Sequence, residues 1–448
     1  MESETFNHVS SHPEDSGIRM ARNSFQLIIV GLVLLGTTRQ AIAQAGEDPA
    51  VVSMDGFVQQ VLVRNPVLAA DRAAVEAGLL RVPQVGALPD PMVGLSLMNI
   101  PVTTFRLDQE PMTMKQLTVT QGFPAPGVLR ARTAVADAGV QIAERQLVLT
   151  REQLVQVAKN AYLGLYFLDE SISIVAENQA LLQQFVRNAE IRYTTGRGIQ
   201  QDVLKAQLEH SRLTERLIIL EEMRVGLVSR LNALRDRPAD TPIAELTLPR
   251  DIPGLFEPDK LKEAAEEKSP ALARARAMVE QRQTSVELAQ RLRLPSWSLS
   301  TAYAQRDGGR RDFITAVVGV QIPIYAGRKQ NKAVEEARSR VAEANYRLRD
   351  VQLQIESTVE KLASELRRSR RLMELYADQI LPQAEGVLTS TLAGYRVDQV
   401  DFLTLIAAQT TLFNYQLEAV RVTTEYHRRL ADLEAVTGTP LDELQGEQ

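Results

Sequence analysis

The sequence predicts a mainly α-helical protein with a β-barrel part, built from two copies of one structural unit. Three observations support this prediction. The two halves of the chain resemble each other at a nearly constant offset, each half contains a pair of short segments in which side-chain character alternates, and each half then continues into a long, almost uninterrupted helical pattern. Alternation with a period of two indicates strands, whereas a period near 3.6 indicates helices. Each copy is therefore expected to contain a helix, a β-hairpin and a long helix pair.

The duplication is clearest at the two ends of each copy. The segment 66–76 is repeated at 270–280, an offset of 204 residues (270 − 66). At the far end, Tyr193–Gly196 corresponds to Tyr395–Asp398, an offset of 202 (395 − 193). Matches that keep nearly the same offset over a long stretch indicate tandem homologous units.

The boundaries follow from composition. Proline is dense between the copies, which excludes a helix interior there. The N-terminus has a basic patch, a short apolar run at 25–36 and a small-residue site at 41–43, a three-part form typical of a secretory signal. The apolar run is shorter than the roughly 20 residues that a membrane-spanning helix needs. We expect a signal peptide at 1–45 (the start is Met1 or Met20), a first repeat at 46–235, a Pro-rich linker at 236–258, a second repeat at 259–441 and a tail at 442–448.

The alternating segments predict β-hairpins. Between 297 and 303, bulky residues such as Trp297 and Tyr303 alternate with serines and an alanine, so one face of the strand is suited to an apolar medium. Its partner is expected at 313–322 after a turn at Gly308-Gly309, because paired glycines favour tight hairpin turns. The first copy has the corresponding segments at 92–99 and 117–122.

Long helices are expected after each hairpin. From 129 to 191 there is no proline, and roughly 60 residues at a rise of about 1.5 Å give a rod on the order of 90 Å. Leucines at sevenfold spacing from Leu213 to Leu234 predict that the returning helix packs as a coiled coil. The turn between the rods is expected near Tyr193, with Gly196 and Gly198 in it, and the equivalent turn of the second copy runs from Tyr395 to Asp398, where aspartate can accept a positive φ.

Four strands cannot close a barrel, and open sheet edges are not tolerated in lipid. Three copies would pool twelve strands (3 × 4), which predicts a trimeric 12-strand outer-membrane β-barrel continued by an α-helical barrel.

The 51 basic and 56 acidic residues give a net charge of −5, which argues against nucleic acid as a partner. The chain has no cysteine, and it has no phosphate-binding loop or hydrolase motif, so we expect neither an enzyme nor a cofactor.

Four short motifs occur in this order of elements, and together they resemble the TolC-type outer-membrane efflux proteins over about 55–441. They are Asn65-Pro66-Val67-Leu68, Gln121-Gly122-Phe123-Pro124-Ala125-Pro126-Gly127, Asp202-Val203-Leu204-Lys205-Ala206-Gln207 and Ile322-Pro323-Ile324-Tyr325-Ala326-Gly327-Arg328. The resemblance implies a passive homotrimeric duct in the outer membrane of a Gram-negative bacterium, with a periplasmic helical extension. It also implies a periplasmic adaptor and an inner-membrane pump of the RND type as partners, and opening by dilation of the helical tip.

The resemblance places the gate at the tip. Asp202 and Tyr395 match the aspartate and tyrosine that link neighbouring helix pairs in the family. Many relatives have a further aspartate where this chain has Ala407, so Asp398 and Asp401 are candidates for a substitute ring of carboxylates. The alternative is that Asp202 and Asp401 are simply residues favoured at helix starts.

Methionines gather at the first hairpin. Thioether sulfur suits Cu(I) or Ag(I), and the surrounding segment resembles heavy-metal efflux members of the family, but methionine also fills apolar gaps. Metal ligation therefore stays a weak candidate role, at Met92, Met98, Met112 and Met114. The substrate is left open between metal ions and drugs. The competing function, a periplasmic coiled-coil adaptor or scaffold, is disfavoured because an adaptor should have a single helical hairpin.

Overall fold

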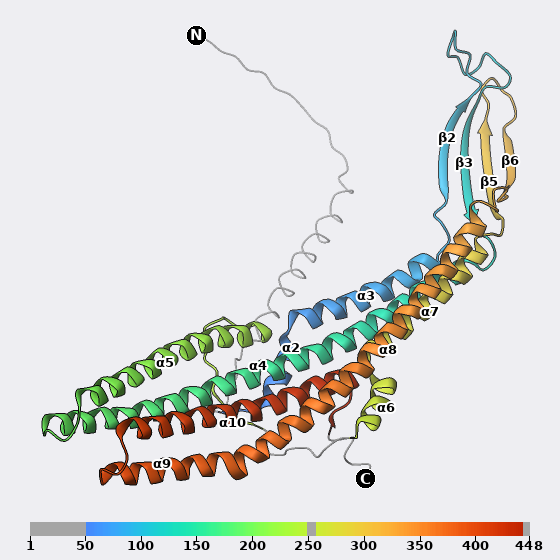
Figure 1. Cartoon of the computed structure of the whole chain (residues 1–448). Helices are drawn as coiled ribbons and strands as arrows, with labels where there is room; N and C mark the ends of the chain where they lie inside the picture. Colours follow the sequence, from blue (N-terminus) through green and yellow to red (C-terminus); the bar gives the residue numbers. More distant parts are fainter. Residues whose placement is uncertain (1–50, 249–256, 442–448) are drawn as a thin grey trace, which may run out of the picture. The chain divides into compact units, whose positions relative to one another are not determined.

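Both copies of the repeat fold into the expected order of elements. A computed structural model describes residues 51–248 and 257–441 (Figure 1). The expected signal peptide, the tail and residues 249–256 of the linker lie outside the described residues. The first copy contains α2 (Met54–Arg64), α3 (Pro66–Gly86), β2 (Met92–Met98), β3 (Met114–Phe123), α4 (Val128–Thr194) and α5 (Gln200–Leu234). The second contains α6 (Pro258–Lys268), α7 (Pro270–Arg291), β5 (Ser296–Gln305), β6 (Phe313–Gln321), α8 (Gln330–Leu375), a π-helix (Tyr376–Ile380), α9 (Leu381–Arg396) and α10 (Phe402–Thr437). Two short strands complete the list: β1 (Val51–Val52) precedes α2, and β4 (Glu245–Leu246) lies between α5 and α6.

The helix before each hairpin starts at a proline, where the missing N–H costs nothing. In α3 the side chain of Asn65 accepts a hydrogen bond from the backbone N–H of Val67 at 2.9 Å and so caps the helix. Proline is disfavoured in a helix interior, yet α3 contains Pro83 and continues to Gly86. Its last turn packs closely on α4, since a Cβ at Gly86 would lie 2.8 Å from the hydroxyl of Thr133. Tertiary contact thus extends the helix past the proline.

The four long strands form one antiparallel sheet in the order β2-β3-β5-β6. One face carries the bulky residues: Trp297 lies opposite Phe123 and Val320, and Tyr303 lies opposite Leu117 and Ile314. The other face carries mostly small and polar residues, together with Met92, Met98 and Met114. The bulky face is open in the single chain, where Trp297 is 42% exposed, whereas Ala302 on the opposite face is 6% exposed. Strand β3 begins at Met114 rather than at the predicted residue 117, because its first residues pair with β2 and β5.

The long helices of the two copies are equal in length. Helix α4 has 67 residues, about 100 Å at 1.5 Å per residue. In the second copy the span from the start of α8 to the end of α9 also covers 67 residues (396 − 330 + 1). The sequence predicts one long helix here, but the helix is interrupted, because residues 376–380 form a π-helical turn just before Pro382. Proline has no N–H to donate and disturbs the turn that precedes it.

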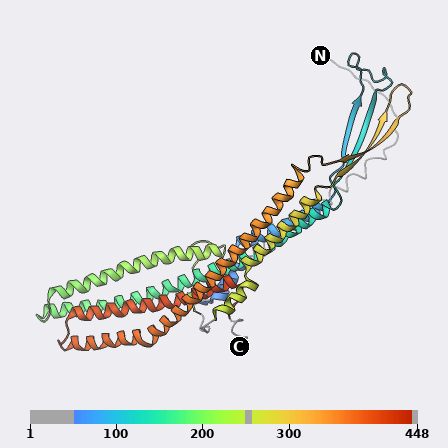
Figure 2. The same ribbon diagram turned by 45° about the vertical axis from the view of Figure 1, so that its right-hand side comes forward.

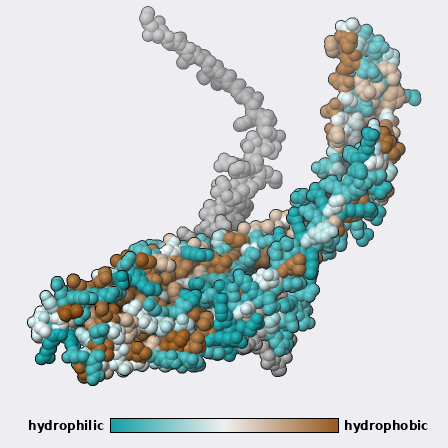
Figure 3. All heavy atoms as spheres, in the orientation of Figure 1, coloured by the Kyte–Doolittle hydropathy of each residue, from teal (hydrophilic) through white to brown (hydrophobic). Residues whose placement is uncertain are grey.

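Helix α4 is the common packing partner of the helical part, in contact with α3, α5, α7 and α10. Figures 1 and 2 show the sheet at one end of these helices and the α4–α5 and α9–α10 turns at the other. The predicted coiled-coil leucines of α5 face this packing, since Leu220 is buried and the other three, Leu213, Leu227 and Leu234, are half-buried. Figure 3 shows that apolar residues nevertheless remain on the surface, over the sheet and over the helices.

The described residues from Val52 to Leu441 belong to one structural unit. Across residues 51–248 and 257–441, the helices lack the combination of length and apolar character that a membrane crossing requires.

Candidate functional site

The turns at the two helical tips share one backbone pattern. After α4, the N–H of Arg197 donates to the carbonyl of Arg192 at 2.8 Å, and Gly196 has a φ of +72°. After α9, the N–H of Gln399 donates to the carbonyl of Gly394 at 2.9 Å, and Asp398 has a φ of +60°. Both ends are therefore helix caps of the Schellman type, with one residue in the left-handed region. Aspartate at 398 adopts the conformation that glycine adopts at 196, as predicted from their alignment.

The other two residues named for the first turn differ, since Gly198 is sterically constrained and Tyr193 is exposed. Gly198 lies against the end of α4, where an added Cβ would be 3.1 Å from the Cβ of Arg192 and 3.2 Å from the backbone nitrogen of Tyr193. The Tyr193 side chain is 48% exposed. The tip turn thus lies where the sequence predicts it, and its part in gating stays a prediction.

Arg192 joins the two tips within one chain. Its guanidinium forms an ion pair with Asp398, donates to the backbone carbonyl of Tyr395 at 3.3 Å and lies 4.7 Å from the centre of the Tyr395 ring. An arginine over an aromatic face adds a cation–π attraction to the ion pair. Sequence reasoning missed Arg192, although a basic residue in the last turn of a helix, next to a predicted tip turn, was an available signal.

Asp202 and Tyr395, the residues carried over from the family resemblance, lie near Arg192 but are not bonded to each other in the described structure. Burial raises the pKa of Asp202, the carboxylate of Asp401 raises it further, and Arg192 partly opposes both effects. Burial is also the main cause of the raised pKa of Tyr395. Asp202 is the third residue of α5 and does not cap it, since the capping position is Ile199.

Asp401 caps α10. Its carboxylate accepts a hydrogen bond from the backbone N–H of Thr404 at 2.7 Å, and this bond lowers its pKa. Asp398 is engaged by Arg192, so both carboxylates proposed for a substitute ring already have partners within one chain. The helix-start interpretation therefore describes Asp401, which caps α10, and Asp202 also lies in the first turn of its helix, α5.

An apolar cluster packs the α4–α5 helix pair against the α9–α10 helix pair behind these polar groups. Phe185 and Ala189 of α4 pack with Ala206 of α5 and with Phe402 and Leu405 of α10. The ring of Tyr395 lies on this cluster, 5.8 Å between centroids from Phe402. The polar contacts of Arg192 therefore lie at the edge of a packed tip.

The methionines do not converge on one point. Met98 and Met114 are direct cross-strand partners on the small-residue face of the sheet. Met92 pairs with Thr120 at the opposite end of β2, and Met112 precedes β3 in an exposed loop. Among the described residues there is also no cluster of three or more histidine, aspartate or glutamate side chains suited to a metal ion.

Comparison with known proteins identifies the family. The model of the outer membrane efflux protein family matches residues 57–225 and 261–439, most of both repeats. This chain belongs to the outer membrane efflux protein family. The interpretation of the chain as an efflux channel of the outer membrane, with a helical part in the periplasm, is confirmed, and the alternative of a periplasmic adaptor is set aside.

Similar proteins cover nearly the whole chain. The outer membrane efflux protein BepC of Brucella suis biovar 1 (strain 1330) is 24% identical over 424 residues, which covers 88% of this chain and 86% of that protein. The outer membrane protein VceC of Vibrio cholerae has the same fold, with a TM-score of 0.72 and 18% identity over 86% of this chain and 96% of VceC. The CmeC outer membrane channel of Campylobacter jejuni superimposes with a TM-score of 0.74 and 12% identity over 88% of this chain and 89% of CmeC. The expected fold, mainly helical with a β part, is thus confirmed.

Proposed function

We propose that three copies of this efflux protein form a passive duct through the outer membrane. A periplasmic adaptor connects this duct to an inner-membrane pump of the RND type. The observation that most directly supports this proposal is the open sheet. In the described chain its edges are β2 and β6, and its bulky face is unpartnered. A sheet with free edges is not tolerated in lipid, so β6 of one copy must pair with β2 of the next.

Three copies would close a barrel of twelve strands (3 × 4) with the bulky face toward lipid and the small polar face toward the lumen. Such a duct binds and releases cargo without changing it, and it uses no cofactor. The experiment is cysteine cross-linking in the outer membrane between Val318 of β6 and Val93 of β2, in a chain that has no other cysteine. Oxidation is expected to give covalent dimers and trimers, whereas monomers alone would refute the pairing of these edges.

We infer that opening of the periplasmic end separates the α4–α5 tip from the α9–α10 tip. The contacts of Arg192 with Asp398 and Tyr395 resist this separation in the closed duct. Asp398 is 67% exposed in the ion pair, so water competes with the contact and its net strength is modest. A weak link is suited to a gate that partner proteins must open.

The cargo is proposed as either soft metal ions or organic compounds, and a susceptibility panel separates the two. A deletion strain and its complemented parent are compared with copper, silver and zinc salts and with dyes, detergents and antibiotics. Selective sensitivity to metals supports a metal-efflux assembly, and the complementing copy with Met98→Leu and Met114→Leu then tests the cross-strand methionine pair. Broad sensitivity to organic compounds assigns the methionines to packing.

A further inference from the structure

Basic side chains that lack an ion-pair partner within the described residues gather where β3, β5 and β6 join the helices; the connection to β2 carries Asp90 instead. We call this group the basic collar, and it consists of Arg130, Arg132, Arg291, Arg293, Arg328 and Lys329. All six side chains are exposed, and each lies within nine residues of the helix-proximal end of a strand. The neighbouring sequence contains no aspartate or glutamate at 124–132, 288–295 or 322–330.

The collar differs from the other basic residues of the helical part. On α8, exposed bases such as Arg340 and Arg347 pair with glutamates one turn away on the same helix. Within residues 51–248 and 257–441, by contrast, none of the six collar residues forms an ion pair with a carboxylate. Unpaired charges of one sign that are grouped together indicate a surface complementary to an anionic partner.

Apolar side chains alternate with these charges. Leu292 and Leu294 flank Arg293 and are 46% and 43% exposed, and Ile324 near Arg328 is 76% exposed. The bulky face of the sheet ends here in an aromatic pair, since Phe123 and Trp297 stack with centroids 4.0 Å apart. Aromatic residues at the end of an apolar sheet face mark the membrane–water interface of outer-membrane barrels.

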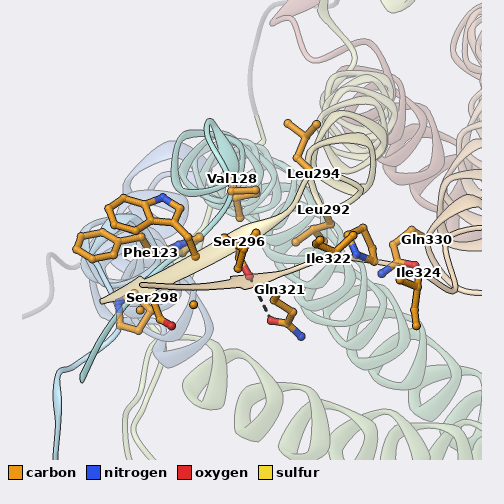
Figure 4. A pocket seen from close by; sticks show the side chains of 18 of the residues that line it. Phe123, Val128, Leu292, Leu294, Ser296, Ser298, Gln321, Ile322, Ile324 and Gln330 are labelled. Atoms are coloured by element: carbon orange, nitrogen blue, oxygen red, sulfur yellow. Dashed lines mark hydrogen bonds between the residues drawn. The ribbon is translucent and has the colours of Figure 1, made fainter. Parts of the chain in front are cut away.

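A hollow of about 750 Å³ lies beneath the sheet at this level. It is lined by Arg132 and Lys329 of the collar together with Leu292, Leu294, Trp297 and Tyr325. Figure 4 shows Ile322 and Ile324 beside Gln330, and the hydroxyl of Ser296 bonded to Gln321 at 3.2 Å. The hollow therefore combines apolar side chains, polar side chains and two cations in one place.

We propose that the basic collar binds the phosphate groups of anionic phospholipids in the periplasmic leaflet of the outer membrane. The chain lies in that membrane, its helices face the periplasm, and the collar is placed where the apolar face ends and the helices begin. Each cation near a membrane surface is worth roughly fivefold in affinity for anionic lipid at moderate salt. The acyl chains would then contact Trp297 and the apolar residues beside it.

The test uses Trp297, the one tryptophan of the chain. Purified protein is reconstituted with phosphatidylcholine or phosphatidylglycerol that carries brominated acyl chains, and quenching of the tryptophan fluorescence gives the relative affinity of each lipid. The expected result is a preference of roughly fivefold or more for phosphatidylglycerol, which weakens in about 1 M salt. Equal quenching by the two lipids in the native protein would overturn the proposal.

Two charge-matched double variants locate the preference. Arg291→Gln with Arg293→Gln is expected to lower the preference toward unity, whereas Arg187→Gln with Arg230→Gln, at exposed bases of α4 and α5, should leave it unchanged. Arg130→Gln with Arg132→Gln serves as a second collar variant if the first fails to fold. If the collar variants keep the lipid preference but lose their oligomeric state on native gels, the collar is an interface between copies and the proposal is wrong.

Discussion

Replacing Arg192 with glutamine should shift the tip toward its open state. Three contacts are lost: an ion pair to a partner that is 67% exposed, a cation–π contact at 4.7 Å and a hydrogen bond of 3.3 Å to the Tyr395 carbonyl. Exposed ion pairs contribute about 0.2–1 kcal/mol, and exposed cation–π contacts about 0.5–1 kcal/mol. The long hydrogen bond adds little. The loss is therefore about 1–2 kcal/mol for each chain, or roughly 5- to 30-fold in the closed-to-open equilibrium.

The assay is single-channel recording in planar bilayers, with the open fraction as the readout. Asp398→Asn tolerates the left-handed backbone and removes only the ion pair, so it should give a smaller increase than Arg192→Gln. Arg187→Gln, five residues earlier on α4 and also exposed, is the matched control and should behave like the native protein.

The double variant provides the decisive comparison. If Arg192 and Asp398 act through one contact, Asp398→Asn should add almost nothing to Arg192→Gln, because the partner is already gone. Fully additive effects, or an open fraction that does not change in Arg192→Gln, would refute the link. The difference between native and variant channels should also shrink in about 1 M salt, which screens exposed charges.

Three further results are expected. The pKa of Asp202 is raised in the closed tip, so its carboxylate destabilises the closed state at neutral pH, and protonation relieves this as the pH falls toward the ordinary aspartate value of about 3.9. Asp202→Asn should therefore stabilise the closed tip at neutral pH and flatten its response to acid. Conductance measured as a function of pH checks this. Asp401→Ala should lower the melting temperature by about one degree, because a lost cap costs about 1 kcal/mol in a chain of 448 residues, whereas Asp401→Ser, which can still cap α10, should not lower it. Gly438→Ala should lower the free energy of unfolding, measured with denaturant, by more than about 2 kcal/mol, because the φ of residue 438 is +71° and the new Cβ would lie 2.5 Å from the carbonyl oxygen of Lys268. The control is Gly139→Ala, whose new Cβ would meet no other atom, and it should leave the stability unchanged or raise it.

Local patterns in the sequence determined most of the architecture. The repeat, the two-sided strands and the long proline-free segment predicted the order of the hairpins and long helices and the approximate bounds of the strands and of α4, but not the separate helices α2 and α6. The turn chemistry was equally informative, since the alignment of Asp398 with Gly196 predicted a left-handed residue that the structure has. These features depend on neighbours within a few residues, so they can be read from the sequence alone.

The tertiary structure decided the contacts between distant segments. Arg192 meets Asp398 across 206 residues, and only the packing of α10 on α4 brings them together. Packing also buries Asp202 near Asp401 and holds the last turn of α3 against α4 beyond Pro83. It brings six bases from three separate loops and helix ends to one end of the sheet. A sequence pattern reports which face of an element is apolar, but many partners could cover that face. The choice among them depends on the shape and charge of surfaces that exist only once the chain has folded.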